Sequence, residues 1–248
     1  MLKKILSVIL AATMVLSLAA CGSTGDAGKG KIKVGMVTDT GGVNDGSFNQ
    51  SSWAGLTRAG EELGIEVNYL ESKNDSDYAA NIETFIDEEC DLIIGVGFML
   101  ADAIGAAAAA NPDQKFAIID DSNNAKYSNV ACLMFEQSQA SYLVGYIAGL
   151  TTESDNVGFV IGMATPIMNE FGYGFVAGVL DANKDAKVQM SNANSFADPG
   201  QGKSNATAMI TNGADIIFHA AGGTGLGVIE ACKEANIKQS VLTLTRAH

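Results

Sequence analysis

Short apolar runs alternate with longer amphipathic stretches along most of this chain, which is typical of an α/β protein. The pattern is clearest near the start. Residues 32–37 are mostly apolar and β-branched, as in a buried parallel strand. A loop rich in Asp, Asn and Gly follows, and Ser47 then occupies the position of a helix N-cap. Phe48, Trp53, Leu56 and Leu63 are spaced to form one apolar stripe, so we expect a helix up to residue 63.

The same alternation continues in two series. The first predicts strands at 65–70, 91–96, 115–119 and 130–135, and helices at 75–89 and 100–110. The second predicts helices at 137–150, 168–183, 199–212 and 225–235, and strands at 157–161, 188–192, 215–218 and 240–244. Two such series indicate two α/β lobes of parallel sheets flanked by helices. We place the N-terminal lobe at 31–134 and the C-terminal lobe at 135–248, with the crossover near 134–136.

The first 20 residues have the pattern of a secretory signal peptide. Lys3 and Lys4 precede an apolar run that is too short for a confident membrane span. The run ends in Leu-Ala-Ala-Cys, which matches a bacterial lipobox and predicts lipidation of Cys21. Residues 21–30 would then form a flexible tether, because Gly, Ser and Thr dominate its start. An ordinary signal peptide cut near Ala20, with Cys21 incidental, is the alternative.

Composition excludes several classes of function. The chain has 28 acidic and 15 basic residues, a formal net charge of −13, so nucleic acid is not an expected partner. Two histidines and no CxxC pair leave little material for a metal site, and Cys90, Cys132 and Cys232 are expected to be ordinary buried side chains. We expect neither a metal nor a cofactor.

Candidate binding residues follow the predicted strands. Ligands of open α/β sheets bind at the carboxyl ends of the strands, and carboxylates there can accept hydrogen bonds from sugar hydroxyls, while aromatic rings stack on planar bases. Residues at these positions are Asp39, Asn44, Asp45, Phe48, Asn49, Gly97, Asp120, Thr165, Asn194, Phe196 and 222–224. Each taken alone could also be a turn former or a core aromatic.

Residues 221–227 offer a weak alternative, a dinucleotide-binding loop. The glycines there run G-G-x-G-x-G rather than G-x-G-x-x-G, and no acidic residue follows at the expected distance. The sequence contains no G-x-S-x-G, H-E-x-x-H or Walker motif and no evident nucleophile–base pair. We therefore expect a binding protein rather than an enzyme.

Several segments together resemble the basic membrane lipoprotein family, the substrate-binding lipoproteins of ABC importers of the purine nucleoside receptor type. They are VTDTGGVNDGSFNQSSWAGL, KFAIID, SYLVGYIAGL, VGFVIG, SFADPGQGK and DIIFHAAGGTGLGV. The resemblance implies a two-lobed, type I periplasmic-binding-protein fold that closes on a nucleoside. It also implies site residues: Asp39, Asp45 and Asp120 for polar contacts, Phe48 stacking on the purine beside Asn49, Phe196 as the opposing aromatic, and Gly222 presenting its backbone. Phe171 and Phe175 are rivals to Phe196.

The last ten residues depart from the family pattern. The family continues with a G-V-D segment, a later Lys and returning strands, whereas this sequence reads QSVLTLTRAH. We therefore expect that the second lobe and the return segments are incomplete.

These observations lead to one expected function and two alternatives. We expect a lipid-anchored, monomeric protein on the extracytoplasmic face of the cell membrane, which captures a nucleoside of the inosine, guanosine or adenosine type for an ABC permease. A membrane-anchored ligand-sensing module of the same fold is the first alternative. An NAD-binding enzyme is the second.

Overall fold

The structure is a computed structural model that describes residues 30–241, and side chains up to Lys238. The signal peptide, Cys21, and all of the tether except Gly30 lie outside the described residues. Residues 33–241 belong to one compact unit that contains both described sheets. Within the described range, no helix is long and apolar enough to span a membrane.

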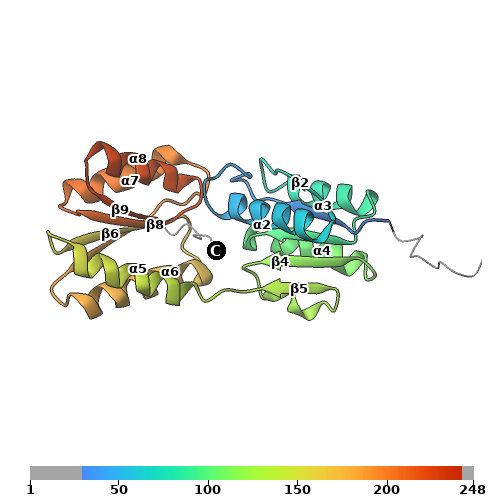
Figure 1. The fold of residues 1–248 in the computed structure, drawn as a ribbon, viewed down its shortest axis with the longest axis horizontal. Coiled ribbons are helices and arrows are strands. Elements are labelled where there is room, and N and C mark those ends of the chain that lie inside the picture. Colours follow the sequence, from blue (N-terminus) through green and yellow to red (C-terminus); the bar gives the residue numbers. More distant parts are fainter. Residues whose placement is uncertain (1–29, 242–248) are drawn as a thin grey trace, which may run out of the picture. The chain divides into compact units, whose positions relative to one another are not determined.

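The first sheet has five parallel strands in the order β2-β1-β3-β4-β5 (Figure 1). Its elements are β1 (Lys33–Val37), α2 (Phe48–Leu63), β2 (Glu66–Leu70), α3 (Asp77–Asp87), β3 (Leu92–Val96), η2 (Phe98–Leu100), α4 (Ala101–Ala110), β4 (Lys115–Ile119), η3 (Asn123–Lys126) and β5 (Val130–Leu133). Alternate residues of its strands face opposite sides. Val34 and Met36 pack towards α2 and its Leu56, while Val37 and Ile93 pack towards α3 and α4.

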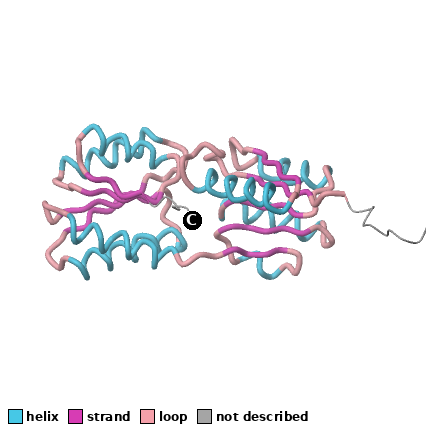
Figure 2. The backbone as a smooth tube through the Cα atoms, viewed as in Figure 1, coloured by secondary structure: helices cyan, strands magenta, loops and turns pink. Residues whose placement is uncertain are grey.

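The second sheet has four parallel strands in the order β7-β6-β8-β9. Its elements are α5 (Gln137–Thr151), β6 (Asn156–Ile161), α6 (Pro166–Ala182), β7 (Lys187–Asn192), α7 (Pro199–Thr211), β8 (Ile216–Ala220), α8 (Thr224–Glu234) and β9 (Lys238–Val241). Phe159 and Phe218 stack under α6 with Phe175, and Val160 and Ile217 face α7 and α8. Figure 2 shows helices against both sheets.

Helices α5 and α6 approach each other unusually closely. A Cβ atom added to Gly145 would collide with the carbonyl of Phe175, and one added to Gly178 would collide with that of Tyr142. Because no side chain fits between the two backbones, glycine is required at these positions.

The starts of α6 and α7 are well specified by sequence. Thr165 accepts a bond from the Met168 amide and precedes Pro166; Asp198 accepts one from the Gln201 amide and precedes Pro199. An N-cap oxygen followed by proline is a strong start signal, and both helices begin at the proline.

The predicted elements are present, with boundaries that shift by a few residues. Four details differ. Cys132 is half-buried, whereas it was expected to be buried like Cys90 and Cys232. The Ser47 side chain makes no capping bond, Leu63 is 72% exposed rather than part of the buried stripe, and β9 begins two residues earlier than predicted. The chain passes from the first sheet to the second between Leu133 and Gln137. The division into lobes at 134/135 stays a prediction.

Candidate ligand-binding cavity

A cavity of about 530 Å³ lies where the carboxyl ends of strands from both sheets meet. This volume suits a small organic ligand. All seven residues predicted to bind a ligand line it: Asp39, Asp45, Phe48, Asn49, Asp120, Phe196 and Gly222. The structure therefore brings them together, although their contact with a ligand stays a prediction. Gly97 also lines the cavity, whereas the other candidates do not: Asn44, Thr165, Asn194, Gly223 and Thr224.

Asn49 ties two carboxylates of the first loop together. Its Nδ2 donates to Asp39 Oδ1 at 2.7 Å and to Asp45 Oδ2 at 3.1 Å. Asn49 is 1% exposed, and its own Oδ1 has no partner among the described residues. Its amide is thus already used within the protein, where it separates two negative charges.

Asp45 is the residue that caps α2. It accepts bonds from the amides of Ser47, Asn49 and Gln50 at 2.9–3.1 Å. Negative charge at a helix N-terminus is stabilised by unpaired N–H groups and by the helix dipole. Because both oxygens of Asp45 are occupied, the geometry gives it a structural role, and its predicted bond to a ligand stays a prediction.

Asp39 retains one free oxygen. Its Oδ1 accepts from Gly41 N at 2.8 Å and from Asn49, while no described residue donates to Oδ2. Burial, together with the nearby Asp45 charge, raises the pKa of the Asp39 carboxyl. A donor group of a ligand would offset this burial, which makes Oδ2 a suitable acceptor.

Asp120 ends β4 in an uncommon backbone conformation. Its φ is +59°, in the left-handed region that side chains other than glycine rarely adopt, and such residues cluster at functional sites. No described residue donates to its carboxylate. Burial, and then the charge of Glu170, raise the pKa of Asp120 to about 6. This carboxylate is partly buried and has no donor among the described residues, as expected of a ligand-binding group.

Aromatic rings form much of the cavity wall. Phe48 is half-buried beside Gly97 and packs on the first-sheet cluster. Phe196 lies over Gly162 and meets Phe98 edge to face, with 6.1 Å between ring centroids. The rival Phe175 is fully buried, so it is a core residue; the other rival, Phe171, does line the cavity.

The loop that carries Phe196 is held by the first turn of α8. Thr224 Oγ1 donates to Ser195 O and accepts from Asp198 N, both at 2.9 Å, and Thr224 N donates to Phe196 O. Gly222 adopts φ +52°, which glycine tolerates without strain. Phe196 and Gly222 are therefore fixed relative to each other.

Several lining residues were not selected from the sequence, among them Phe98, Phe135, Glu136, Gln137 and His219. Phe98 directly follows Gly97 at a strand end, which is a signal that could have been used. His219 is buried within β8, neither ring nitrogen has a described partner, and burial lowers its pKa to about 4. Its placement depends on the tertiary fold, so no local pattern marks it.

A second depression, open to solvent, runs along α7 and contains Lys203 and Thr207 but none of the predicted site residues. Among residues 30–238, no group of three or more His, Cys, Asp or Glu side chains is arranged to hold a metal ion.

The chain is similar in sequence to several known proteins. The family model described as ABC transporter substrate-binding protein PnrA-like matches residues 32–245. A CD4+ T-cell-stimulating antigen of Listeria innocua is 42% identical over 246 residues, which cover 94% of this chain and 68% of the relative. The ABC transporter nucleoside-binding protein BmpA of Lactococcus lactis is 38% identical over 246 residues, with 95% and 70% covered.

Solved structures of solute-binding proteins resemble this chain as well. An ABC transporter solute-binding protein of Aeropyrum pernix superposes with a TM-score of 0.78 at 31% identity, over 85% of this chain and 61% of that one. This chain thus spans less than two thirds of that structure. Sugar-binding proteins and LacI-family regulators share the fold at lower identity, which confirms the predicted type I periplasmic-binding-protein class. The chain belongs to the basic membrane protein, PnrA-like family of ABC transporter substrate-binding proteins.

Proposed function

We propose that this chain captures purine nucleosides in the cavity between its two sheets and delivers them to an ABC importer. It would do so as a monomer on the extracytoplasmic face of the cell membrane, anchored through lipidated Cys21. The observation that carries the proposal is the pairing of free carboxylate oxygens, on Asp39 and Asp120, with aromatic faces in one cavity.

This pairing suits the two halves of a nucleoside. Ribose hydroxyls are donors, and an ionised carboxylate accepts them in charge-assisted bonds. A purine has a flat face that stacks on a phenylalanine ring, and Phe48 and Phe196 both offer such rings. The name of the Lactococcus relative describes nucleoside binding by that protein, and at 38% identity it supports the same ligand class here.

The loop before α8 is unsuited to the pyrophosphate of a dinucleotide. A pyrophosphate needs free backbone N–H groups at a helix N-terminus. At the start of α8, Thr224, Gly225 and Leu226 already donate their amides to carbonyls of Phe196, Gly222 and Gly223. This is a physical reason, in addition to the irregular glycine spacing, to disfavour the NAD-enzyme alternative.

Calorimetric titration of the chain with inosine, guanosine, adenosine, ribose and NAD tests the proposal. We expect saturable binding of at least one nucleoside and none of NAD. Binding of ribose without any nucleoside would contradict the purine assignment. A sensing module would bind the same ligand, so it is distinguished by uptake: deletion of the gene should abolish nucleoside import if the chain serves a permease, and leave import intact if it serves a sensor.

A further inference from the structure

Asp121, the residue after Asp120, belongs to a buried hydrogen-bonded cluster and does not line the cavity. It is 4% exposed. Its Oδ1 accepts from the backbone and side-chain amides of Asn123 at 3.2 and 2.9 Å, and its Oδ2 accepts from those of Asn124 at 3.1 and 2.8 Å. A buried carboxylate that accepts several hydrogen bonds is fixed in orientation. The loop after β4 is therefore anchored at the residue that directly follows Asp120.

The side chain of Asn124 extends this anchor to the neighbouring strand end. Its Nδ2 donates to Asp121 Oδ2 and also to the carbonyl oxygen of Ala101, at 2.9 Å. Ala101 begins α4 and donates its own amide to Phe98 O, so it is joined to the short segment that carries Phe98 into the cavity wall. Strands β3 and β4 are neighbours in the first sheet. One buried amide thus joins the segment after β3 to the segment after β4.

Helix α4 also restricts Asn124 on its other side. Asn124 is 4% exposed, and a Cβ atom added to Gly105 of α4 would lie 2.5 Å from Asn124 Oδ1, which is too close for a real contact. The amide therefore has little room to rotate. Its orientation is set both by the two bonds that Nδ2 donates and by the helix that Oδ1 faces.

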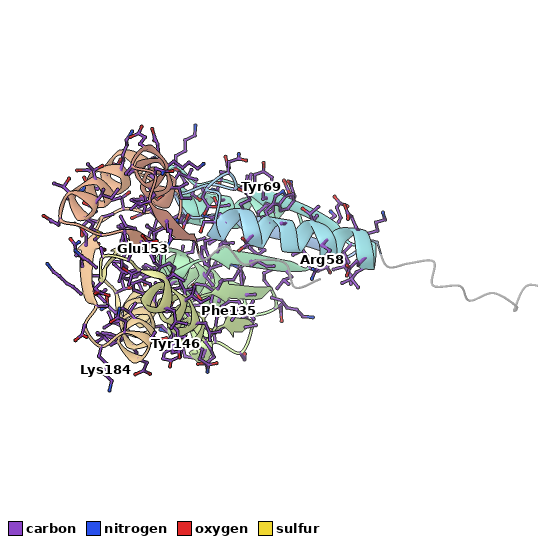
Figure 3. All side chains as sticks on the ribbon, turned by 60° about the vertical axis from the view of Figure 1, so that its left-hand side comes forward. Arg58, Tyr69, Phe135, Tyr146, Glu153 and Lys184 are labelled. Carbon is purple, nitrogen blue, oxygen red and sulfur yellow. The ribbon has the colours of Figure 1, made fainter. Side chains whose placement is uncertain are left out.

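Asp120 lies between two fixed points of the backbone. On one side its amide donates to Leu133 O at 2.9 Å, at the end of β5, and on the other side Asp121 is held in the buried cluster. Its φ of +59° is uncommon for a residue with a side chain, and such a conformation persists where the surrounding structure imposes it. Strand β5 then leads to Phe135, which lines the cavity and is labelled in Figure 3. The two fixed points therefore determine where the Asp120 carboxylate lies between Phe98 and Phe135.

We propose that Asn124 is a positioning residue of the binding site, which fixes the Asp120 carboxylate by tying together the segments after β3 and β4. Asn124 does not line the cavity, so it acts on ligand affinity without touching the ligand. The effect on nucleoside affinity rests on the proposed function, whereas the effect on the Asp120 carboxylate itself does not depend on any ligand.

A double-mutant cycle, measured by calorimetry, tests whether Asn124 acts through Asp120. Asn124→Ala should weaken inosine binding about tenfold, because the released loop lets the carboxylate move away from the ligand. In the Asp120→Asn background the same substitution should change the affinity about twofold or less, since the group that it positions has already been replaced. Equal losses in both backgrounds, or an unaltered affinity in Asn124→Ala, would overturn the inference.

Carbon-13 NMR of the Asp120 side chain gives a readout that needs no ligand. The parent carboxyl should titrate near pH 6, because burial and then the charge of Glu170 raise its pKa. In Asn124→Ala this pKa should fall towards the ordinary value of 3.8, because the released side chain gains contact with water. Asp120 has Glu170 of α6, Glu136 of the cavity wall and the adjacent Asp121 as neighbouring carboxylates, and the variant keeps all three. A change in the titration therefore reports a change in the position of Asp120.

Gly105→Ala tests the same point without removing a hydrogen-bonding group. The added methyl group should displace the Asn124 amide, and so lower both the Asp120 pKa and the affinity for inosine. Gly60→Ala is its control on α2, because the methyl group added there would meet the Val67 side chain and the Ile65 carbonyl, which do not line the cavity. Both values should stay as they are in the parent.

Asn129→Ala is the matched control for Asn124→Ala. Asn129 also donates side-chain bonds, at the opposite end of α4, to the carbonyls of Ala108, Asn111 and Gln114. The Asn129→Ala variant should be less stable than the parent and should keep both its Asp120 pKa and its affinity for inosine. If inosine does not bind the parent, the proposed function fails, and the NMR titration still decides the inference. An Asp120 pKa that stays near 6 in folded Asn124→Ala and Gly105→Ala would overturn it, because the carboxylate would then keep its position without Asn124.

Discussion

The side-chain amide of Asn49 lies 2.7 Å from Asp39 Oδ1, and this bond determines which oxygen of Asp39 is available to a ligand. With Oδ1 occupied by Asn49 and by Gly41 N, Oδ2 is the acceptor that remains. The same amide group also bonds Asp45, which starts α2. One buried side chain thus connects the start of a helix to the orientation of a binding carboxylate.

Asn49→Ala is therefore expected to damage stability and binding together. Loss of the amide leaves two buried carboxylates facing each other, so the free energy of unfolding should fall by about 1–3 kcal/mol. Inosine affinity should fall about tenfold or more, because Asp39 loses its fixed orientation. Thermal melts and calorimetric titration measure the two effects.

Asn81→Ala is the matched control. Asn81 also donates two bonds, to Glu71 O and Ser72 Oγ, but it does not line the cavity. The Asn81→Ala variant should be less stable than the parent and should keep the parent's affinity for inosine. If Asn49→Ala binds inosine as well as the parent does, then Asn49 does not position Asp39 for the ligand.

Substitution of Phe48, in the cavity wall, and of Phe175, in the core, should separate effects on ligand affinity from effects on folding stability. Phe48→Ala should weaken nucleoside binding about 5- to 150-fold, the equivalent of about 1–3 kcal/mol of stacking. Because Phe48 is half-buried against the first-sheet cluster, some stability should be lost as well. Phe175 is fully enclosed, so Phe175→Ala should cost about 3–5 kcal/mol of folding stability.

In the fraction of Phe175→Ala that remains folded, inosine affinity should be retained. Calorimetry and thermal melts on both variants decide the matter. Unaltered affinity in Phe48→Ala, accompanied by a large drop in melting temperature, would make Phe48 a core residue and remove it from the site.

The lipid anchor is tested by a substitution outside the described residues. Cys21→Ser should abolish labelling with a fatty-acid analogue and release the protein from the membrane fraction, because two acyl chains on this residue would supply stable anchoring. Cys132→Ser changes a half-buried free thiol and should leave labelling intact. Labelling that persists in Cys21→Ser would show that the anchor is elsewhere.

The fold could be predicted because its elements are marked locally. Buried parallel strands appear as short β-branched runs, and α7 starts at Pro199, as predicted, after the Asp198 cap. Helix α6 starts at Pro166, two residues before its predicted start, although Thr165 and Pro166 mark that start in the sequence. Since the family consists of substrate-binding proteins, the expectation of no enzymatic activity is also confirmed. Leu63 was misjudged because the periodicity of apolar residues does not show whether the last turn of a helix still packs on the core.

The binding site could be predicted only in part. Residues at strand ends converge in any parallel α/β sheet, so Asp39 and Asp120 could be brought together from topology. Phe196 follows a strand of the second sheet, so its place beside them required the two-lobed fold that the family resemblance implies. The hydrogen bonds and ring contacts within the site could not be predicted. The use of Asp45 as a cap, and the insertion of Phe98 against Phe196, depend on distances between elements that no local pattern encodes.

The pH dependence of stability should reveal Asp120. Its pKa in the folded protein, about 6, lies above the ordinary value of 3.8. The folded state therefore binds more protons than the unfolded state between these values, and the free energy of unfolding falls as pH rises from about 4 to about 6. A shift of this size corresponds to at most about 3 kcal/mol, and less after solvent screening.

Asp120→Asn removes the titrating group and keeps the shape of the side chain. Relative to the parent, the variant should gain stability as pH rises through 6, with the difference nearly constant above pH 7 and below pH 4. Urea unfolding of both proteins across this range measures the difference directly. Asp113→Asn, on an exposed turn, should show no such change.

Inosine should also bind the parent more tightly as pH rises through 6, because ionised Asp120 is the stronger acceptor. A constant stability difference between parent and Asp120→Asn from pH 4 to pH 7 would show that this carboxylate is not desolvated, and would remove the strongest reason to assign it a ligand.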